Sequence, residues 1–163
     1  MSISEIFDHG TPHPWANLRF NNLTLDGIFI NDNITNAGTL VVPFSGPIPT
    51  TNFNIDFYKF GKIVVLNIPN IMSSAAGGTT NTNIVSPAGS IPSFLLPDFV
   101  GGTELDYQVR TQNLSLPLQF SGLLQLNNLG MINIIMDNRG SPGFTNTGTR
   151  GIFGITISYI SAT

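Results

Sequence analysis

The sequence predicts an all-β fold, and three observations support this prediction. Apolar and polar residues alternate with period two in several short segments. Few windows hold an apolar helical repeat that is free of proline, glycine and β-branched runs. Turn signals separate the alternating segments, as Asp26-Gly27 does. Together these features predict about eight short strands and no helices.

Three strand patterns stand in the first half of the chain. The segment from Leu23 to Ile30 places Asp-Gly between alternating apolar residues, which predicts a hairpin because type I′ turns need positive φ. Alternation from Phe53 to Tyr58 predicts a strand with one face in a core. Ile63–Ile68 is apolar on both faces, so we expect it to be covered on both sides, either centrally or by another subunit.

The second half continues the pattern. Period-two apolar series from Leu114 to Phe120, from Ile132 to Met136 and from Phe153 to Tyr159 predict three further half-buried strands. Tight turns are expected at residues 60–62 and 127–130, and long loops at about residues 69–102 and 137–151. Such a series of strands predicts a β-sandwich or barrel.

Sheet edges in this fold need protection, because charged residues that could guard them are scarce. We expect closure into a jelly roll, or burial of the edges by oligomerisation. The residues expected in the core or in subunit contacts are Ile63, Val64, Val65, Leu66, Ile68, Phe153, Ile155, Ile157 and Tyr159.

The amino-acid composition excludes several classes of function. Only 9% of the residues are charged, against roughly 25% in ordinary globular proteins, and the formal net charge is -3. A surface with so little charge has no strong field that would steer it toward phosphates, so no nucleic acid partner is expected. The chain has no cysteine, which excludes disulfides and thiolate metal sites and leaves the redox compartment open. It has no apolar run of transmembrane length and no signal-peptide pattern at its start, so we expect synthesis in the cytoplasm and no membrane insertion.

Three parts of the chain differ in pattern. Residues 1–16 contain prolines and both histidines with little periodicity, and we interpret them as a flexible or anchoring tail. Residues 17–37 carry the Asp-Gly hairpin and an Asn-rich stretch, and we interpret them as a hairpin or short stalk. Residues 38–163 hold the dense strand pattern of a head domain.

Residues suited to chemistry are few. Asp98, Glu104 and Asp106 form the only close acidic group and are the calcium candidates, with a solvated loop edge as the alternative. His9 and His13 have a helical metal spacing, but the intervening Gly10 and Pro12 rule out a regular helix. No nucleophile–base pair and no phosphate loop occur, so we expect no catalytic residue and no cofactor.

An ordered series of segments resembles the trimeric jelly-roll heads of the C1q/TNF-like class, in particular those of phage and large-DNA-virus fibre or capsid-associated proteins. The matching segments are residues 44–47, Phe57–Pro69, Ile91–Pro97, Gly122–Leu126, Gly130–Ile134 and Gly154–Ile160. The resemblance covers roughly the last three quarters of the chain. It implies a homotrimer around a threefold axis, with receptor or glycan recognition in some relatives and no shared catalytic residues.

Low charge, the doubly apolar segment and this resemblance together lead to one functional expectation. The chain is expected to be a non-enzymatic, homotrimeric structural or attachment protein on a virion or extracellular particle, contacting a cell-surface glycan or protein receptor. A cellular lectin or TNF/C1q-like ligand is the first alternative. A polysaccharide-active enzyme is the second, and it requires two carboxylates facing each other across a cleft.

Overall fold

The computed structural model describes residues 22–25, 28–31, 34–99, 102–113, 119–137 and 143–163, in two compact units, Met1–Asn33 and Ile34–Thr163. In the first unit, β1 (Asn22–Leu25) and β2 (Ile28–Asn31) pair antiparallel, with Leu25 opposite Ile28. This pairing is the hairpin that the sequence predicts. The Asp26-Gly27 turn itself and the expected tail of residues 1–16 lie outside the described residues.

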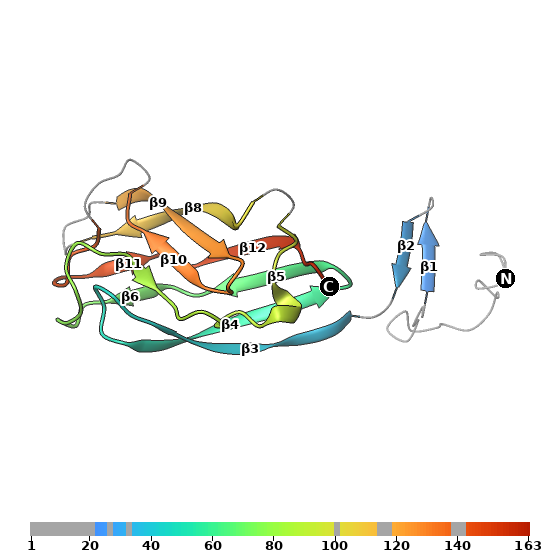
Figure 1. Cartoon of the computed structure of the whole chain (residues 1–163), viewed down its shortest axis with the longest axis horizontal. Helices are drawn as coiled ribbons and strands as arrows, with labels where there is room; N and C mark the ends of the chain where they lie inside the picture. Colours follow the sequence, from blue (N-terminus) through green and yellow to red (C-terminus); the bar gives the residue numbers. More distant parts are fainter. Residues whose placement is uncertain (1–21, 26–27, 32–33, 100–101, 114–118, 138–142) are drawn as a thin grey trace, which may run out of the picture. The chain divides into compact units, whose positions relative to one another are not determined.

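The second unit contains two antiparallel sheets that form a β-sandwich (Figure 1). The four-stranded sheet has the order β12-β5-β4-β3. Its strands are β3 (Ile34–Phe44), β4 (Thr51–Phe60), β5 (Ile63–Ile68) and β12 (Ile155–Ile160). The all-β sandwich predicted from the sequence is therefore confirmed.

The opposite sheet has six strands in the order β6-β11-β8-β9-β10-β7. Its strands are β6 (Ile71–Ser73), β7 (Ile84–Val85), β8 (Glu104–Gln112), β9 (Gln119–Asn127), β10 (Ile132–Ile135) and β11 (Arg150–Ile152). A single turn of 3₁₀ helix, η3 (Ser93–Leu95), lies between β7 and β8. Within the described part of the chain, no helix is long and apolar enough to cross a membrane.

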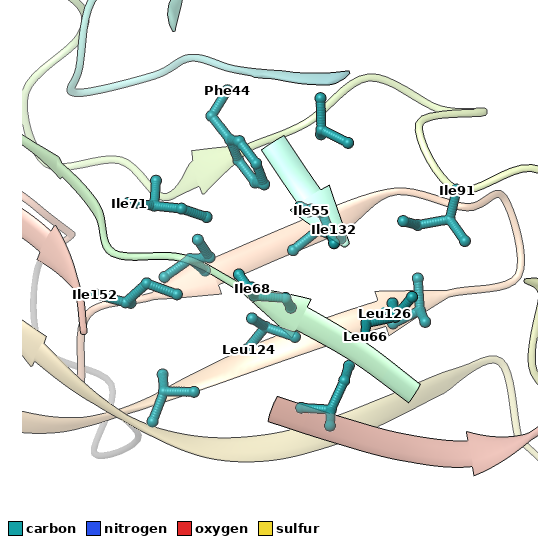
Figure 2. Packing of buried hydrophobic residues seen from close by; sticks show 14 of the residues in the cluster. Phe44, Ile55, Leu66, Ile68, Ile71, Ile91, Leu124, Leu126, Ile132 and Ile152 are labelled. Atoms are coloured by element: carbon teal, nitrogen blue, oxygen red, sulfur yellow. The ribbon is translucent and has the colours of Figure 1, made fainter. Parts of the chain in front are cut away.

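One hydrophobic core fills the space between the sheets. Phe44, Ile55 and Leu66 project from the four-stranded sheet, and Leu124 and Ile132 meet them from the six-stranded sheet (Figure 2). All five are fully buried. Because inward and outward side chains alternate along each strand, this core fixes which residues face outward and can meet a partner.

Most of the predicted strands are present. Residues 53–58 lie in β4, residues 63–68 form β5, and β10 and β12 cover most of the two predicted C-terminal strands. The strand expected from Leu114 is described only from Gln119 onward, as β9. The long segment of residues 69–102 contains the short strands β6 and β7 besides its loops.

The sequence prediction missed β3, which lies at an edge of the four-stranded sheet. Its Pro43 sits opposite Asn52 of β4. An edge strand tolerates proline because one row of its backbone groups needs no partner strand. The strand begins at Ile34, so residues 34–37 pair with β4, although the sequence places them with the stalk. The division into tail, stalk and head stays a prediction.

Candidate functional site

The strand β5 has two distinct faces in the single chain. Val64, Leu66 and Ile68 are buried in the sandwich core. On the opposite face Ile63 is 53% exposed and Val65 is half-buried. Among the described residues of the sandwich, only one face of this doubly apolar strand is covered, and the expectation that another subunit covers the second face stays a prediction.

The apolar series predicted from Phe153 to Tyr159 lies only partly in β12 and in the core. Ile157 and Tyr159 are buried, and Ile155 packs against the core from a half-buried position. Phe153 was expected on the same face, but it precedes β12 and lies under Arg110 at 4.4 Å from the guanidinium carbon to the ring centroid. Its N–H donates to the main-chain oxygen of Arg110, which keeps Phe153 beside the six-stranded sheet.

Apolar side chains gather at one end of the outer face of the four-stranded sheet. Cross-strand pairing aligns Phe60, Ile63 and Ile160 in one row. The next row aligns Tyr58, Val65 and Ser158. We call Tyr58, Phe60, Ile63, Val65 and Ile160 the apolar outer patch. Of these, Tyr58, Phe60, Ile63 and Ile160 are 40%, 42%, 53% and 61% exposed.

Polar residues occupy the adjoining row of the same outer face. Pairing aligns Asp56, Asn67 and Thr156 there. Thr39 Oγ1 donates to the Asp56 carboxylate at 2.6 Å, and Thr156 Oγ1 donates to Asn67 Oδ1 at 2.8 Å. The outer face therefore changes from apolar to hydrogen-bonded polar within one row of residues.

The outer face of the six-stranded sheet carries both polar side chains and the half-buried Leu123 and Ile135, and it has a shallow depression. Gln108, Val109, Arg110, Phe120 and Ser121 line this depression, whose volume is about 330 Å³. Gln108 Nε2 donates to Ser121 Oγ, and both residues are exposed. The Arg110 side chain is exposed and lies over Phe153, so its guanidinium is positioned by stacking while it faces solvent.

A ladder of polar side chains continues across the same face. Asn133 Nδ2 donates to Gln125 Oε1 at 2.8 Å, and Gln125 Nε2 donates to the Asp106 carboxylate at 3.0 Å. The ladder joins β10, β9 and β8. Asn133 Oδ1 is buried without a hydrogen-bond partner. Amide, carboxylate and guanidinium groups thus share one outer surface.

The calcium candidates do not form a site in the structure. In the part of the chain that the structure describes, no group of three or more His, Cys, Asp and Glu side chains could hold a metal ion. Glu104 and Asp106 are exposed residues of β8, which corrects the alternative in which they lie at a loop edge. The main-chain N–H of Asp98 donates to the oxygen of Ile160. His9 and His13 lie outside the described residues.

A buried arginine is the feature that sequence reasoning missed. Arg150 is fully buried, and its guanidinium donates to main-chain oxygens of Pro47, Ser73, Ala75 and Gly148. Burial lowers its pKa from the ordinary value. A signal existed in the rarity of positive charge, since the chain has only six Lys and Arg residues. The sequence could not show that main-chain oxygens from three loops converge on this guanidinium.

Comparison with known proteins gives a likeness at the level of the fold. No family model matches this chain, and no curated protein matches it. Among solved structures, the chain is similar to the reovirus attachment protein sigma1, crystallised in complex with alpha-2,3-sialyllactose. The sequence identity is 13%, the TM-score is 0.51, and the match covers 96% of this chain and 82% of that chain. This likeness shows that the two chains share a β-sandwich fold.

Proposed function

We propose that this chain is a non-enzymatic, homotrimeric attachment protein of a virion, built on a C1q/TNF-like jelly roll, that contacts a host glycan or protein receptor. The observation that carries the proposal is the likeness of its sandwich to the reovirus attachment protein sigma1. Low charge and the apolar side chains that the described residues leave exposed on the four-stranded sheet support an assembling surface protein.

The distribution of carboxylates favours binding over catalysis. Asp56 is exposed on the outer face of the four-stranded sheet, whereas Glu104 and Asp106 are exposed on the opposite sheet. Glycoside hydrolysis needs two carboxyl groups that face each other across a cleft. The described positions of these acids do not supply such a pair across the sandwich, so the polysaccharide-active enzyme has no supporting geometry among them.

The depression beside Arg110 is the proposed glycan contact. Gln108 and Ser121 offer amide and hydroxyl groups, and Arg110 offers cationic donors that suit an acidic sugar. Small-ligand sites combine a concave surface with a few placed polar groups. The polar groups of this depression meet the second part of that description on a shallow scale, while Val109 and Phe120 in its lining pack mainly into the core.

A glycan array with sialylated and neutral sugars tests the binding part of the proposal. The wild-type chain is expected to bind a subset of sugars, and Arg110→Ala is expected to weaken binding at least tenfold. Lys62→Ala, which also removes one exposed positive charge, serves as the control and is expected to bind like wild type. Absence of binding across all sugar classes would contradict glycan contact and leave a protein receptor.

The virion part of the proposal needs a separate measurement. Mass spectrometry of purified particles from the source is expected to detect the chain as a particle component. A chain that is abundant in infected or producing cells but absent from purified particles would contradict a virion location and favour a cellular lectin or signalling ligand.

A further inference from the structure

We propose that the apolar outer patch is the surface through which copies of this chain assemble. This inference rests on the proposed homo-oligomer and names the face that forms it. The partner at the patch is a second copy of the same chain, which packs its own apolar outer patch toward a common axis.

The patch is contiguous across three strands. Ile63 of β5 lies between Phe60 of β4 and Ile160 of β12 in the register of the sheet. Residues directly opposite each other on one face have Cβ atoms about 5 Å apart, so these side chains form one apolar surface. Within the two rows of the patch, none of the described side chains is charged.

The exposed area matches the largest apolar patch of a typical monomer, and such patches are often functional. An aromatic side chain buries 150–250 Å² when covered, so the exposed parts of Tyr58, Phe60, Ile63 and Ile160 together leave on the order of 300 Å² of apolar surface. This area is less than half of what one partner buries in a standard interface, so the patch can form only the apolar centre of one. A standard interface buries roughly 800 Å² per partner around an apolar centre, which the patch supplies.

The neighbouring polar row fits the rim of such an interface. Asp56 and Asn67 already accept hydrogen bonds from Thr39 and Thr156 within the chain. Because these side chains already have hydrogen-bond partners, burying them against another subunit costs less desolvation free energy. An apolar centre beside a hydrogen-bonded rim is the usual anatomy of a protein interface.

The position of the patch favours a second copy as its occupant. β3 enters the sandwich at Ile34, which pairs with Phe60 in the first row of the patch. A patch without charge also gives no electrostatic selection for a charged partner, whereas identical apolar patches match one another.

Light scattering after size exclusion of the full chain tests the inference, over a series of concentrations. Wild type is expected at a multiple of the 17.5 kDa monomer mass, and at three times that mass for the trimer. Ile63→Glu and Ile160→Glu are each expected to shift the chain to monomer. Both side chains are more than half exposed in the single chain, so the fold should survive, as circular dichroism would report.

Val41→Glu is the matched control. Val41 is 63% exposed on the same outer face, but it pairs with Asn54 beyond the polar row. It is expected to keep the wild-type mass. Because the chain has no cysteine, a second measurement is available: Ile160→Cys is expected to form disulfide-linked copies on mild oxidation, and Val41→Cys is not.

The outcomes separate this inference from the proposed function. A wild-type oligomer that persists in both glutamate variants, without cross-linking through Ile160→Cys, would overturn the patch but leave the homo-oligomer standing. A wild-type monomer at every concentration would overturn the homo-oligomer itself and the patch with it. Dissociation by Val41→Glu as well as by Ile63→Glu would overturn the placement at the apolar end.

Discussion

Arg150 donates two hydrogen bonds to the main-chain oxygen of Pro47, at 2.9 Å from Nε and 2.6 Å from Nη2. The same guanidinium donates to Ala75 and Gly148, each at 2.6 Å. One side chain therefore joins the β3–β4 connection, the segment after β6 and the segment before β11. It satisfies main-chain oxygens that a buried loop would otherwise leave without partners.

Arg150→Met is expected to destabilise the fold by about 3 kcal/mol or more, because it keeps the length of the side chain but leaves several main-chain oxygens without donors. Arg150→Lys should lose less stability, since the lysine ammonium can still donate to some of the main-chain oxygens that the guanidinium binds. Urea unfolding at a fixed protein concentration measures both. Lys62→Ala is the control, and an Arg150→Met protein as stable as this control would show that the carbonyl cluster contributes nothing.

Tyr159 couples stability to alkaline pH. Its Oη donates to the main-chain oxygen of Leu95 at 2.7 Å, and burial together with the nearby Tyr107 raises its pKa above the ordinary value of 10.0. In the unfolded chain the phenol ionises near pH 10, while in the fold it stays protonated. The stabilisation is therefore complete below about pH 10 and is lost as pH rises beyond it, by up to about 1.4 kcal/mol per pH unit.

Tyr159→Phe isolates this effect. The variant loses the hydrogen bond to Leu95 and is expected to be about 1 kcal/mol less stable at about pH 7. Its stability should then fall less steeply than that of wild type between about pH 10 and 12. Tyr107, whose pKa is also raised by burial, is present in both proteins, so the difference between their curves reports Tyr159 together with its interaction with Tyr107. Parallel pH curves for the two proteins would refute the role assigned to Tyr159.

Gly122 marks a close approach inside β9. A Cβ at this position would collide with the main-chain oxygen of Ile135 and the methyl group of Thr111, and would come within 2.8 Å of the Met136 oxygen. Gly122→Ala is therefore expected to cost about 1–3 kcal/mol or more through overpacking. Gly102→Ala, whose Cβ would meet only the Glu104 oxygen at 3.8 Å, is the matched control. Equal melting temperatures would argue against a tight contact at Gly122.

The strands that could be predicted from sequence are those whose inward residues alternate strictly with polar ones. β4 and β12 follow this rule, and β5 was recognised from its continuous apolar run. β8 was missed although Leu105, Tyr107 and Val109 alternate with polar residues, because Glu104 and Asp106 were interpreted as loop acids. Their charges are accommodated on an outward face, which only pairing with β9 establishes.

The candidate site was less predictable than the fold. The sequence marked Ile63 and Val65 as apolar, but their register beside Phe60 and Ile160 depends on cross-strand pairing of segments far apart in the chain. Arg110 likewise contacts Phe153 because the N–H of Phe153 donates to the main-chain oxygen of Arg110 in β8. These two residues are far apart in the chain. Periodicity reports which face a residue occupies, whereas neighbours on that face come from topology.

Val65 and Leu66 are adjacent in β5 and point to opposite faces, which allows folding to be separated from assembly. Leu66→Asp would place an unpaired carboxylate in the core, where Leu66 is fully buried, and is expected to prevent folding. Val65→Asp changes a half-buried residue of the outer face and is expected to give a folded monomer. Circular dichroism measures whether each variant folds, and light scattering measures its assembly state. A Val65→Asp chain that still assembles like wild type would mean that this face stays open to solvent in the oligomer.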